Sequence, residues 1–205
     1  MTLLQMPKQD FRVGQQQFVF PEITIQPNEL VGLIGQTGSG KSILLRQLAG
    51  LMDTQAPLTF TGKRKAFIFS RGGLFQRHSI LENLRLATLF TDLNISTKDI
   101  EQVLQQWNLQ GIQDKFPNQL NAQTNKLVQI VRAVVLQPDI LFIEKPLVGL
   151  SPHQIEQFSA WIAEHVQNRG SVVYSEESTR TFHALQPRKI MLDGGHDNLR
   201  TVMHH

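Results

Sequence analysis

The sequence contains no cysteine among its 205 residues, and it has one tyrosine and two tryptophans. This absence excludes disulfide scaffolds, thiolate zinc sites and cysteine nucleophiles. The chain also lacks the ~18–20 consecutive apolar residues of a membrane-spanning helix, and its first residues, MTLLQMPKQD, lack the features of a signal peptide. Its net charge is only +3, and Lys63–Lys65 is its one basic cluster. We therefore expect a cytoplasmic protein that does not bind nucleic acid and does not insert into a membrane, although other proteins could hold it there.

Short apolar runs alternate with helical patterns along the chain. Four runs bounded by Gly, Pro, Ser or Asp are predicted to be central parallel strands, at 30–34, 67–69, 140–143 and 172–174. Helices are predicted at 42–48, 81–90, 97–107, 122–136 and from Pro152 onward. Ser96 and Asp99 are placed as a capping box for the third of these helices, Pro138 stops the fourth, and Ser151 is the expected cap of the last. The chain is predicted to end in a hairpin around Gly194 and Gly195. This alternation indicates an α/β fold with a mostly parallel central sheet and helices on both faces.

One motif points to a specific chemistry. The segment between the first apolar run and the first helix reads Gly35, Gln36, Thr37, Gly38, Ser39, Gly40, Lys41, Ser42, which matches the phosphate-binding loop G-x-x-x-x-G-K-[ST]. Its glycines allow backbone N–H groups to surround phosphate oxygens, and the helix N-terminus adds partial positive charge. We expect Lys41 to reach the outer phosphates of ATP or ADP and Ser42 to coordinate Mg²⁺. The alternative is a glycine-rich turn that binds no ligand.

Four further segments follow this loop in a fixed order. They are Phe67–Phe75 with Ile80–Leu84, Leu120–Thr124 with Val131–Ala133, Gln137–Ile143, and Pro146–Pro152. In order and spacing they resemble the Q-loop, signature, Walker B and D-loop segments of the ATP-binding subunits of ABC transporters, over nearly the whole chain. The P-x-V-G-x-x-P form of the last segment, with Arg-Gly-Gly-Leu-Phe at 71–75, looks most like the ATPases of Mce/Mla-type lipid transport systems.

The resemblance implies a P-loop NTPase of the ABC type in which residues 1–205 form a single nucleotide-binding domain. It also implies a sheet core with a small antiparallel β-subdomain and a helical subdomain, over residues 1–75 with 137–205 and about 76–136. The short distance between the loop helix and Phe67 predicts that the β-subdomain is reduced. Phe11 lies where this family places an aromatic ring on adenine. Phe18 is the second candidate, and core packing is an equal alternative for Phe11.

The sequence departs from the family pattern at the catalytic positions. Ser70 stands at the Q-loop glutamine, Glu144 at the Walker B aspartate, Lys145 at the catalytic glutamate, Ser151 at the D-loop aspartate and Glu176 at the switch histidine. The signature glycines are replaced, because the segment reads Leu120, Asn121, Ala122, Gln123, Thr124. Glu144 could still hold Mg²⁺ weakly, through a water molecule.

These replacements predict impaired ATP hydrolysis, with no intact catalytic residue. Attack of water on the γ-phosphate needs a carboxylate that orients or deprotonates the water, and loss of a general base typically costs about 10²–10⁴-fold. Lys145 would instead repel Mg²⁺ and attract phosphate. A shift of the alignment would make Glu144 the base and Asp139 a metal ligand, but Asp139 lies at the wrong end of the predicted strand.

By its resemblance, the chain is expected to pair head to tail with a second copy or with a competent ATP-binding subunit. The pair would dock on an integral membrane permease at the cytoplasmic face of the inner membrane, with the region 70–84 against the permease. The favoured function is a degenerate nucleotide-binding subunit with a structural or regulatory role in lipid transport. One alternative is a working ATPase that uses Glu144 or Glu176. The other is a free-standing nucleotide-binding adaptor without a permease.

Overall fold

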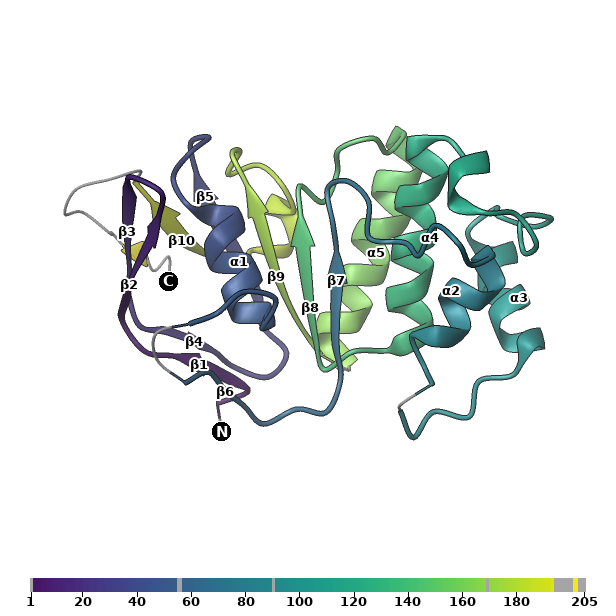
Figure 1. Cartoon of the computed structure of the whole chain (residues 1–205), viewed down its shortest axis with the longest axis horizontal. Helices are drawn as coiled ribbons and strands as arrows, with labels where there is room; N and C mark the ends of the chain where they lie inside the picture. The colour runs from purple at the N-terminus through teal and green to yellow at the C-terminus, as the bar shows by residue number, and fades with distance from the viewer. Residues whose placement is uncertain (1, 55–56, 90, 169, 194–200, 203–205) are drawn as a thin grey trace.

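A mostly parallel sheet forms the centre of the chain (Figure 1). The computed structural model describes residues 2–54, 57–89, 91–168, 170–193 and 201–202. The strand order is β11-β10-β5-β9-β8-β7. Five of these strands run parallel: β5 (Leu30–Gly35), β7 (Lys65–Ile68), β8 (Ile140–Glu144), β9 (Ser171–Glu176) and β10 (Arg188–Leu192). The four predicted central strands are therefore confirmed, although β7 begins two residues earlier than predicted and ends before Phe69.

The last two strands pair with each other in antiparallel fashion, as the predicted terminal hairpin requires. The edge strand β11 (Thr201–Val202) runs antiparallel to β10, with Ile190 opposite Thr201. The predicted turn at Gly194 and Gly195 lies outside the described residues.

The helices occupy the predicted regions, with boundaries set by local hydrogen bonds. They are α1 (Lys41–Ala49), α2 (Ile80–Leu86), α3 (Thr97–Gln106), α4 (Ala122–Leu136) and α5 (Pro152–Asn168), with short 3₁₀ turns at Pro117–Gln119 and His183–Leu185. Ser96 and Asp99 form the predicted capping box of α3. Among the described residues, no helix is both long and apolar enough to cross a membrane.

One helix is shorter than the sequence pattern predicts. The pattern extends to residue 90, but α2 ends at Leu86. The hydroxyl of Thr88 donates to the carbonyl oxygen of Arg85, and the hydroxyl of Thr91 donates to that of Thr88. Such side-chain bonds offer the backbone an alternative to the helical ladder, so the apolar pattern alone overestimates the length of α2.

Short antiparallel strands lie at one end of the molecule, and α2, α3 and α4 lie at the other end (Figure 1). A three-stranded sheet contains β1 (Leu4–Met6), β4 (Ile23–Ile25) and β6 (Thr59–Phe60), and a separate hairpin contains β2 (Gln9–Val13) and β3 (Gln16–Phe20). Two apolar clusters cover the faces of the central sheet. One joins it to α4 and α5, and the other joins it to α1 and the short strands. Because both faces are covered, the carboxyl ends of the parallel strands are the edge where a ligand site is expected.

Candidate functional site

The phosphate-binding loop has the strand–loop–helix geometry that its sequence predicts. It leaves β5 at Gly35 and enters α1 at Lys41. Gly38 and Gly40 both have φ = +87°, a left-handed conformation that other residues rarely adopt. A Cβ atom at Gly40 would lie 2.7 Å from Cδ1 of Phe18. Glycine at these positions therefore permits both the turn of the loop and its close packing against β3.

The side chain of Lys41 is folded into this loop. Its Nζ donates to the carbonyl oxygens of Gly35 and Gln36, at 2.7 and 2.6 Å. Burial lowers the pKa of Lys41. The charges of Glu177 and Glu176 raise it in part, and the charge of Lys145 lowers it further. Ser42 lies exposed in the first turn of α1. The loop thus holds a buried cation next to an exposed hydroxyl, the two side chains that the motif supplies to a nucleotide and its metal ion.

An open groove of about 640 Å³ lies against the loop, at the carboxyl ends of β5, β9 and β10. The residues that line it are Gln16, Ile34–Ser39, Glu177, Thr179 and Met191–Asp193. The groove therefore brings together backbone groups of the loop, one carboxylate beyond β9 and the end of β10. This position at the carboxyl edge of a parallel sheet fits a polyphosphate chain laid over the N-terminus of α1.

Glu144, the residue at the Walker B position, is buried and engaged by its neighbours. Its side chain is 3% exposed, and its Oε1 lies 2.8 Å from Nε of Arg46. The two atoms form a charge pair without an aligned hydrogen bond. Its Oε2 accepts hydrogen bonds from the hydroxyl and the backbone N–H of Ser70, at 3.2 and 3.4 Å. The residues predicted at the Q-loop and Walker B positions, Ser70 and Glu144, are therefore bonded to each other.

The pairing of Glu144 bears on the predicted magnesium site. Mg²⁺ prefers several oxygen ligands in octahedral geometry, and the oxygens of Glu144 already have Arg46 and Ser70 as partners. The described residues contain no group of three or more His, Asp or Glu side chains placed to hold a metal ion. Ser42 and Glu144 are the predicted ligands, and Mg²⁺ at Glu144 would have to compete with Arg46.

Lys126 provides a second buried cation beneath the same strand ends. Its side chain reaches from α4, is 5% exposed, and its Nζ donates to the carbonyl oxygens of Phe69, Glu144 and Lys145 at 3.3–3.4 Å. Burial lowers its pKa to about 8, against the opposing charges of Glu144 and Glu176. Lys126 thus ties the end of β8 to the segment that follows β7.

The predicted base position, Lys145, faces an acid that the sequence analysis did not single out. Lys145 has φ = 47°, and its Nζ lies 3.8 Å from Oε1 of Glu177. The same oxygen accepts a hydrogen bond of 2.7 Å from the hydroxyl of Thr37 in the phosphate loop. This hydrogen bond, followed by the charges of Lys145 and Lys41, holds the pKa of Glu177 below its ordinary value.

Glu176, predicted at the switch-histidine position, has a different partner. Its carboxylate accepts from the backbone N–H of Glu177 at 2.8 Å. Glu177 is therefore the acid that bonds to the phosphate loop. Its position directly after Glu176, just beyond β9, is the signal that could have identified it.

The residues at the signature and D-loop positions serve local structure. Asn121 caps α4 by accepting from the backbone N–H of Thr124 at 2.7 Å, and Gln123 donates to the side chain of Gln154 on α5 at 2.8 Å. Ser151 confirms its prediction as a helix cap, because its hydroxyl accepts from the backbone N–H of Gln154.

The aromatic candidates lie side by side on one hairpin. Phe11 on β2 stands opposite Phe18 on β3. Phe18 is 8% exposed and packs where a Cβ of Gly40 would lie, whereas Phe11 is partly buried. Phe18 therefore supports the loop directly, and Phe11 is the ring of this pair that is more open to a base.

Asp139 lies at the opposite end of β8 from Glu144, which contradicts the alternative that makes it a metal ligand. Its Oδ2 accepts from the backbone N–H groups of Lys63 and Arg64, at 2.6 and 2.8 Å. These bonds fix the start of β8 beside the start of β7. Asp139 is therefore a structural residue at the far edge of the sheet.

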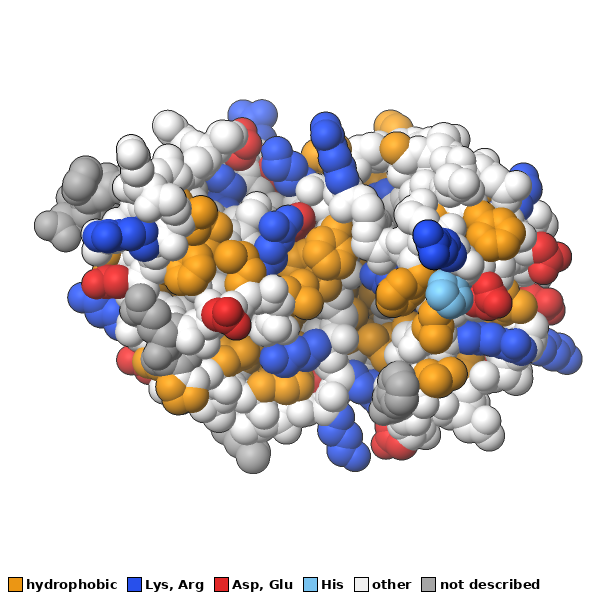
Figure 2. Space-filling model, in the orientation of Figure 1, with side chains coloured by type: hydrophobic (Ala, Val, Ile, Leu, Met, Phe, Trp, Pro, Cys, Tyr) orange, Lys and Arg blue, Asp and Glu red, His pale blue; other side chains and the backbone are white. Residues whose placement is uncertain are grey.

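A rigid loop follows β7 and presents an exposed ring. The guanidinium of Arg132 donates to the carbonyl oxygen of Gly73 at 2.6 Å, and the buried amide of Asn83 bonds to both backbone groups of Phe75. The side chain of Phe75 is 56% exposed at the edge of a groove of about 250 Å³ that also contains Leu51 and Phe67. Figure 2 shows hydrophobic side chains in the hollow between the two ends of the molecule.

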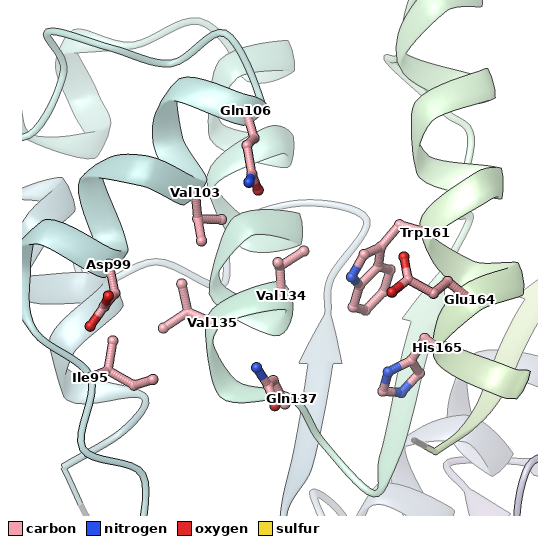
Figure 3. A pocket seen from close by; sticks show the side chains of 10 residues that line it. All are labelled: Ile95, Asp99, Val103, Gln106, Val134, Val135, Gln137, Trp161, Glu164 and His165. Carbon is pink, nitrogen blue, oxygen red and sulfur yellow. The ribbon is translucent and has the colours of Figure 1, made fainter. Parts of the chain in front are cut away.

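A further hollow of about 530 Å³ lies between α3, α4 and α5 (Figure 3). The ring of Trp161 stacks on that of His165 at 4.9 Å, and Val134 and Gln137 belong to the end of α4 that faces them. No residue of the phosphate loop lines this hollow. It is therefore separate from the groove at the carboxyl ends of the strands.

Comparisons with known proteins agree with this geometry. A model of the ABC transporter family matches residues 21–148, more than half of the chain. The sulfate/thiosulfate import ATP-binding protein CysA of Synechococcus elongatus is 28% identical over 157 residues, which cover 69% of this chain and 45% of that protein. The CysA protein of Xanthomonas campestris is 25% identical over 192 residues, covering 84% of this chain and 56% of that protein. The chain thus spans about half the length of these relatives.

Solved structures share the fold. An ATP-binding subunit of an ABC transporter has a TM-score of 0.85 at 22% identity, covering 98% of this chain and 90% of that one. A nucleotide-free ATP-binding cassette from an ABC transporter has a TM-score of 0.74 at 16% identity, covering 95% of this chain and 89% of that one. Together with the phosphate loop at the carboxyl end of β5, the family match shows that the chain belongs to the ABC transporter ATP-binding family.

Proposed function

We propose that the chain is a nucleotide-binding subunit of a membrane transport complex that binds ATP or ADP and hydrolyses ATP little or not at all. The proposal rests on the two side chains at the predicted catalytic positions at the end of β8, and on the contacts that they make. The Glu144 carboxylate is paired with Arg46 and Ser70, and the next residue is Lys145, an ammonium in place of a carboxylate.

The proposed lack of hydrolysis follows from proton chemistry. A water molecule that attacks the γ-phosphate must be oriented or deprotonated, and an ammonium can accept no proton. Glu144 is a poor substitute because Arg46 pairs with one of its oxygens and Ser70 bonds to the other. In a homodimer, both composite sites would lack a base. With a competent mate, this chain's site would lack the base and the mate's site would face a signature without glycine.

The proposed binding uses the groove beside the phosphate loop. Backbone N–H groups between Gly35 and Lys41 would bind the phosphates, Lys41 would bridge the outer ones, and Phe11 would stack on adenine. Mg²⁺, where present, would contact Ser42 and only weakly Glu144, because Arg46 holds that carboxylate. We expect nucleotide binding to fix the conformation or the assembly of the complex.

The proposed partner is an integral membrane permease at the cytoplasmic face of the inner membrane. The loop from Ser70 to Ser79 supports this, because Arg132 and Asn83 hold it rigid while Phe75 stays exposed beside an apolar groove. A short apolar helix of a permease would fit this groove. The mate in the complex would be a second copy or a competent ATP-binding subunit.

The proposed cargo is lipid, on the resemblance of residues 71–75 and 146–152 to Mce/Mla-type ATPases. The curated relatives are named for sulfate and thiosulfate import, at 25–28% identity. Purification from native membranes, followed by identification of the proteins and lipids that come with the chain, separates these cargoes. Recovery with an anion-import permease would contradict the lipid proposal, and recovery without any membrane protein would favour the free-standing adaptor.

Calorimetry and phosphate release test the central proposal. The wild-type chain should bind ADP or ATP in the absence of Mg²⁺. Lys41→Ala should weaken this binding about 1,000-fold, because it removes two charge-assisted hydrogen bonds from the ammonium to the phosphates, of about 1.5–3 kcal/mol each. Exposed Lys98→Ala is the matched control. Phosphate release should stay at background, alone and in the purified complex. Release that Lys41→Ala abolishes would instead establish a working ATPase with unorthodox residues.

A further inference from the structure

We infer that Glu177 makes the phosphate-loop groove select nucleoside diphosphates over triphosphates. The inference rests on the proposed nucleotide binding and adds a specificity residue to it. Glu177 was absent from the family-based predictions, yet its carboxylate is the acidic group that bonds to the phosphate loop.

The position of Glu177 is fixed from two sides. Its Oε1 accepts the hydroxyl hydrogen bond of Thr37 at 2.7 Å, and the Nζ of Lys145 lies 3.8 Å from the same oxygen. Its backbone N–H donates to the carboxylate of Glu176 at 2.8 Å. The carboxylate therefore lies over the turn of the loop and lines the groove together with Gln36 and Gly38.

This carboxylate lies at the turn of the loop, in the groove where we expect the outermost phosphate. In a phosphate-binding loop, the backbone holds the inner phosphates and the lysine reaches the outer ones. The charges of Glu177, Lys145 and Glu176 all affect the pKa of Lys41, that of Glu177 most among the three. A diphosphate can reach the loop backbone and Lys41 while Glu177 stays on Thr37. A triphosphate would bring its γ-phosphoryl group against Glu177.

The cations at this end of the sheet already have partners. Lys145 pairs with Glu177, and the ammonium of Lys41 donates to backbone carbonyl oxygens of the loop. Arg46 is committed to Glu144, which leaves that carboxylate poorly suited to hold Mg²⁺ beside the phosphates. To gain a compensating cation, the added charge of a γ-phosphoryl group would have to draw Lys145 away from Glu177, its partner at 3.8 Å.

Calorimetric titration with ADP and ATP in buffer containing EDTA tests the inference. We expect the wild-type chain to bind ADP about 10-fold more tightly than ATP, which corresponds to about 1.4 kcal/mol. Glu177→Gln keeps the size of the side chain and its capacity to form hydrogen bonds but removes its charge. It should bring the affinities for ADP and ATP within about 2-fold of each other, mainly by increasing the affinity for ATP. Exposed Glu101→Gln on α3 is the control and should keep the wild-type preference.

Two further measurements locate the effect. Pyrophosphate and tripolyphosphate, which lack the nucleoside, should show the same preference and the same response to Glu177→Gln. Glu176→Gln should change the preference less than Glu177→Gln, because the Glu176 carboxylate bonds to the backbone of residue 177. Equal changes in these two variants would contradict the assignment to Glu177.

The outcomes separate this inference from the proposed function. Equal or tighter binding of ATP by the wild-type chain, or an unchanged preference in Glu177→Gln, would overturn the selectivity and leave nucleotide binding intact. Failure of the wild-type chain to bind any of the four phosphate compounds would overturn both.

Discussion

The phosphate loop and the neighbouring ends of β8 and β9 differ in how well they match the residue pattern that the family resemblance predicts. The loop keeps the glycines, the lysine and the helix N-terminus on which phosphate binding depends. At the neighbouring strand ends, the side chains of Glu144, Lys145 and Glu177 are engaged by other protein groups. Phosphate binding depends on backbone shape, whereas hydrolysis depends on particular side chains at particular distances. The two properties are therefore separable, as the proposed function requires.

A pH titration of stability should produce the largest effect, at the strand ends. Burial lowers the pKa of Lys126 to about 8 from an ordinary value of 10.5, so between these values the unfolded chain binds more protons than the folded one. The free energy of unfolding should therefore rise with pH, by up to about 3 kcal/mol between pH ~7 and ~10.5, relative to a Lys126→Met variant. Urea unfolding at several pH values measures this difference.

Exposed Lys98→Met supplies the reference for this titration. Its stability should follow that of the wild-type chain across the same pH range. The free energy of unfolding of the wild-type chain, relative to that of Lys126→Met, should rise with pH. If this difference stays constant or falls, the ammonium of Lys126 is not buried against the end of β8.

The Arg46→Ala variant should produce the next largest effect. It should also make the end of β8 better able to bind Mg²⁺, and so more like the phosphate loop in its capacity to bind a ligand. It removes the cation beside a carboxylate that is 3% exposed. Because Arg46 itself is partly exposed, we expect a loss of about 1–2 kcal/mol of stability, less than for a fully buried pair. The freed Glu144 carboxylate should also make nucleotide affinity increase on addition of Mg²⁺.

Thermal unfolding and calorimetry with and without Mg²⁺ measure both effects of Arg46→Ala. Exposed Arg77→Ala is the control and should match the wild type in each. If the wild-type chain already responds to Mg²⁺ as strongly as the Arg46→Ala variant, then Arg46 does not suppress the metal site.

The Phe11→Ala variant should produce the smallest effect, and this effect should be on nucleotide affinity at the phosphate loop. If Phe11 stacks on adenine, ADP affinity should fall about 5-fold, near the lower end of the 1–3 kcal/mol typical of base stacking. Pyrophosphate affinity should not change, and exposed Val19→Ala on the same hairpin should leave both affinities intact. An equal loss of pyrophosphate affinity would mean that Phe11 supports the loop instead of the base.

Much of the fold was predictable because its signals are local. The apolar runs identified the central strands, and Ser96, Ser151 and Pro138 marked helix boundaries that the structure confirms. The shortened α2 was not predictable from its apolar pattern, because the threonine hydroxyls that compete with the helix act only once the backbone turns there. The phosphate loop was identified from its sequence because its function resides in a continuous segment.

The sequence by itself determined that this chain has a phosphate loop on an α/β scaffold, and it predicts a lysine at the position of the family's catalytic glutamate. Only the tertiary structure decided which charges neutralise one another. Arg46 and Glu144 are far apart in sequence, as are Thr37 and Glu177, and the parallel sheet brings each pair together at one edge. The physical reason is that ion pairs and hydrogen bonds depend on distances of a few ångströms, which sequence separation does not encode.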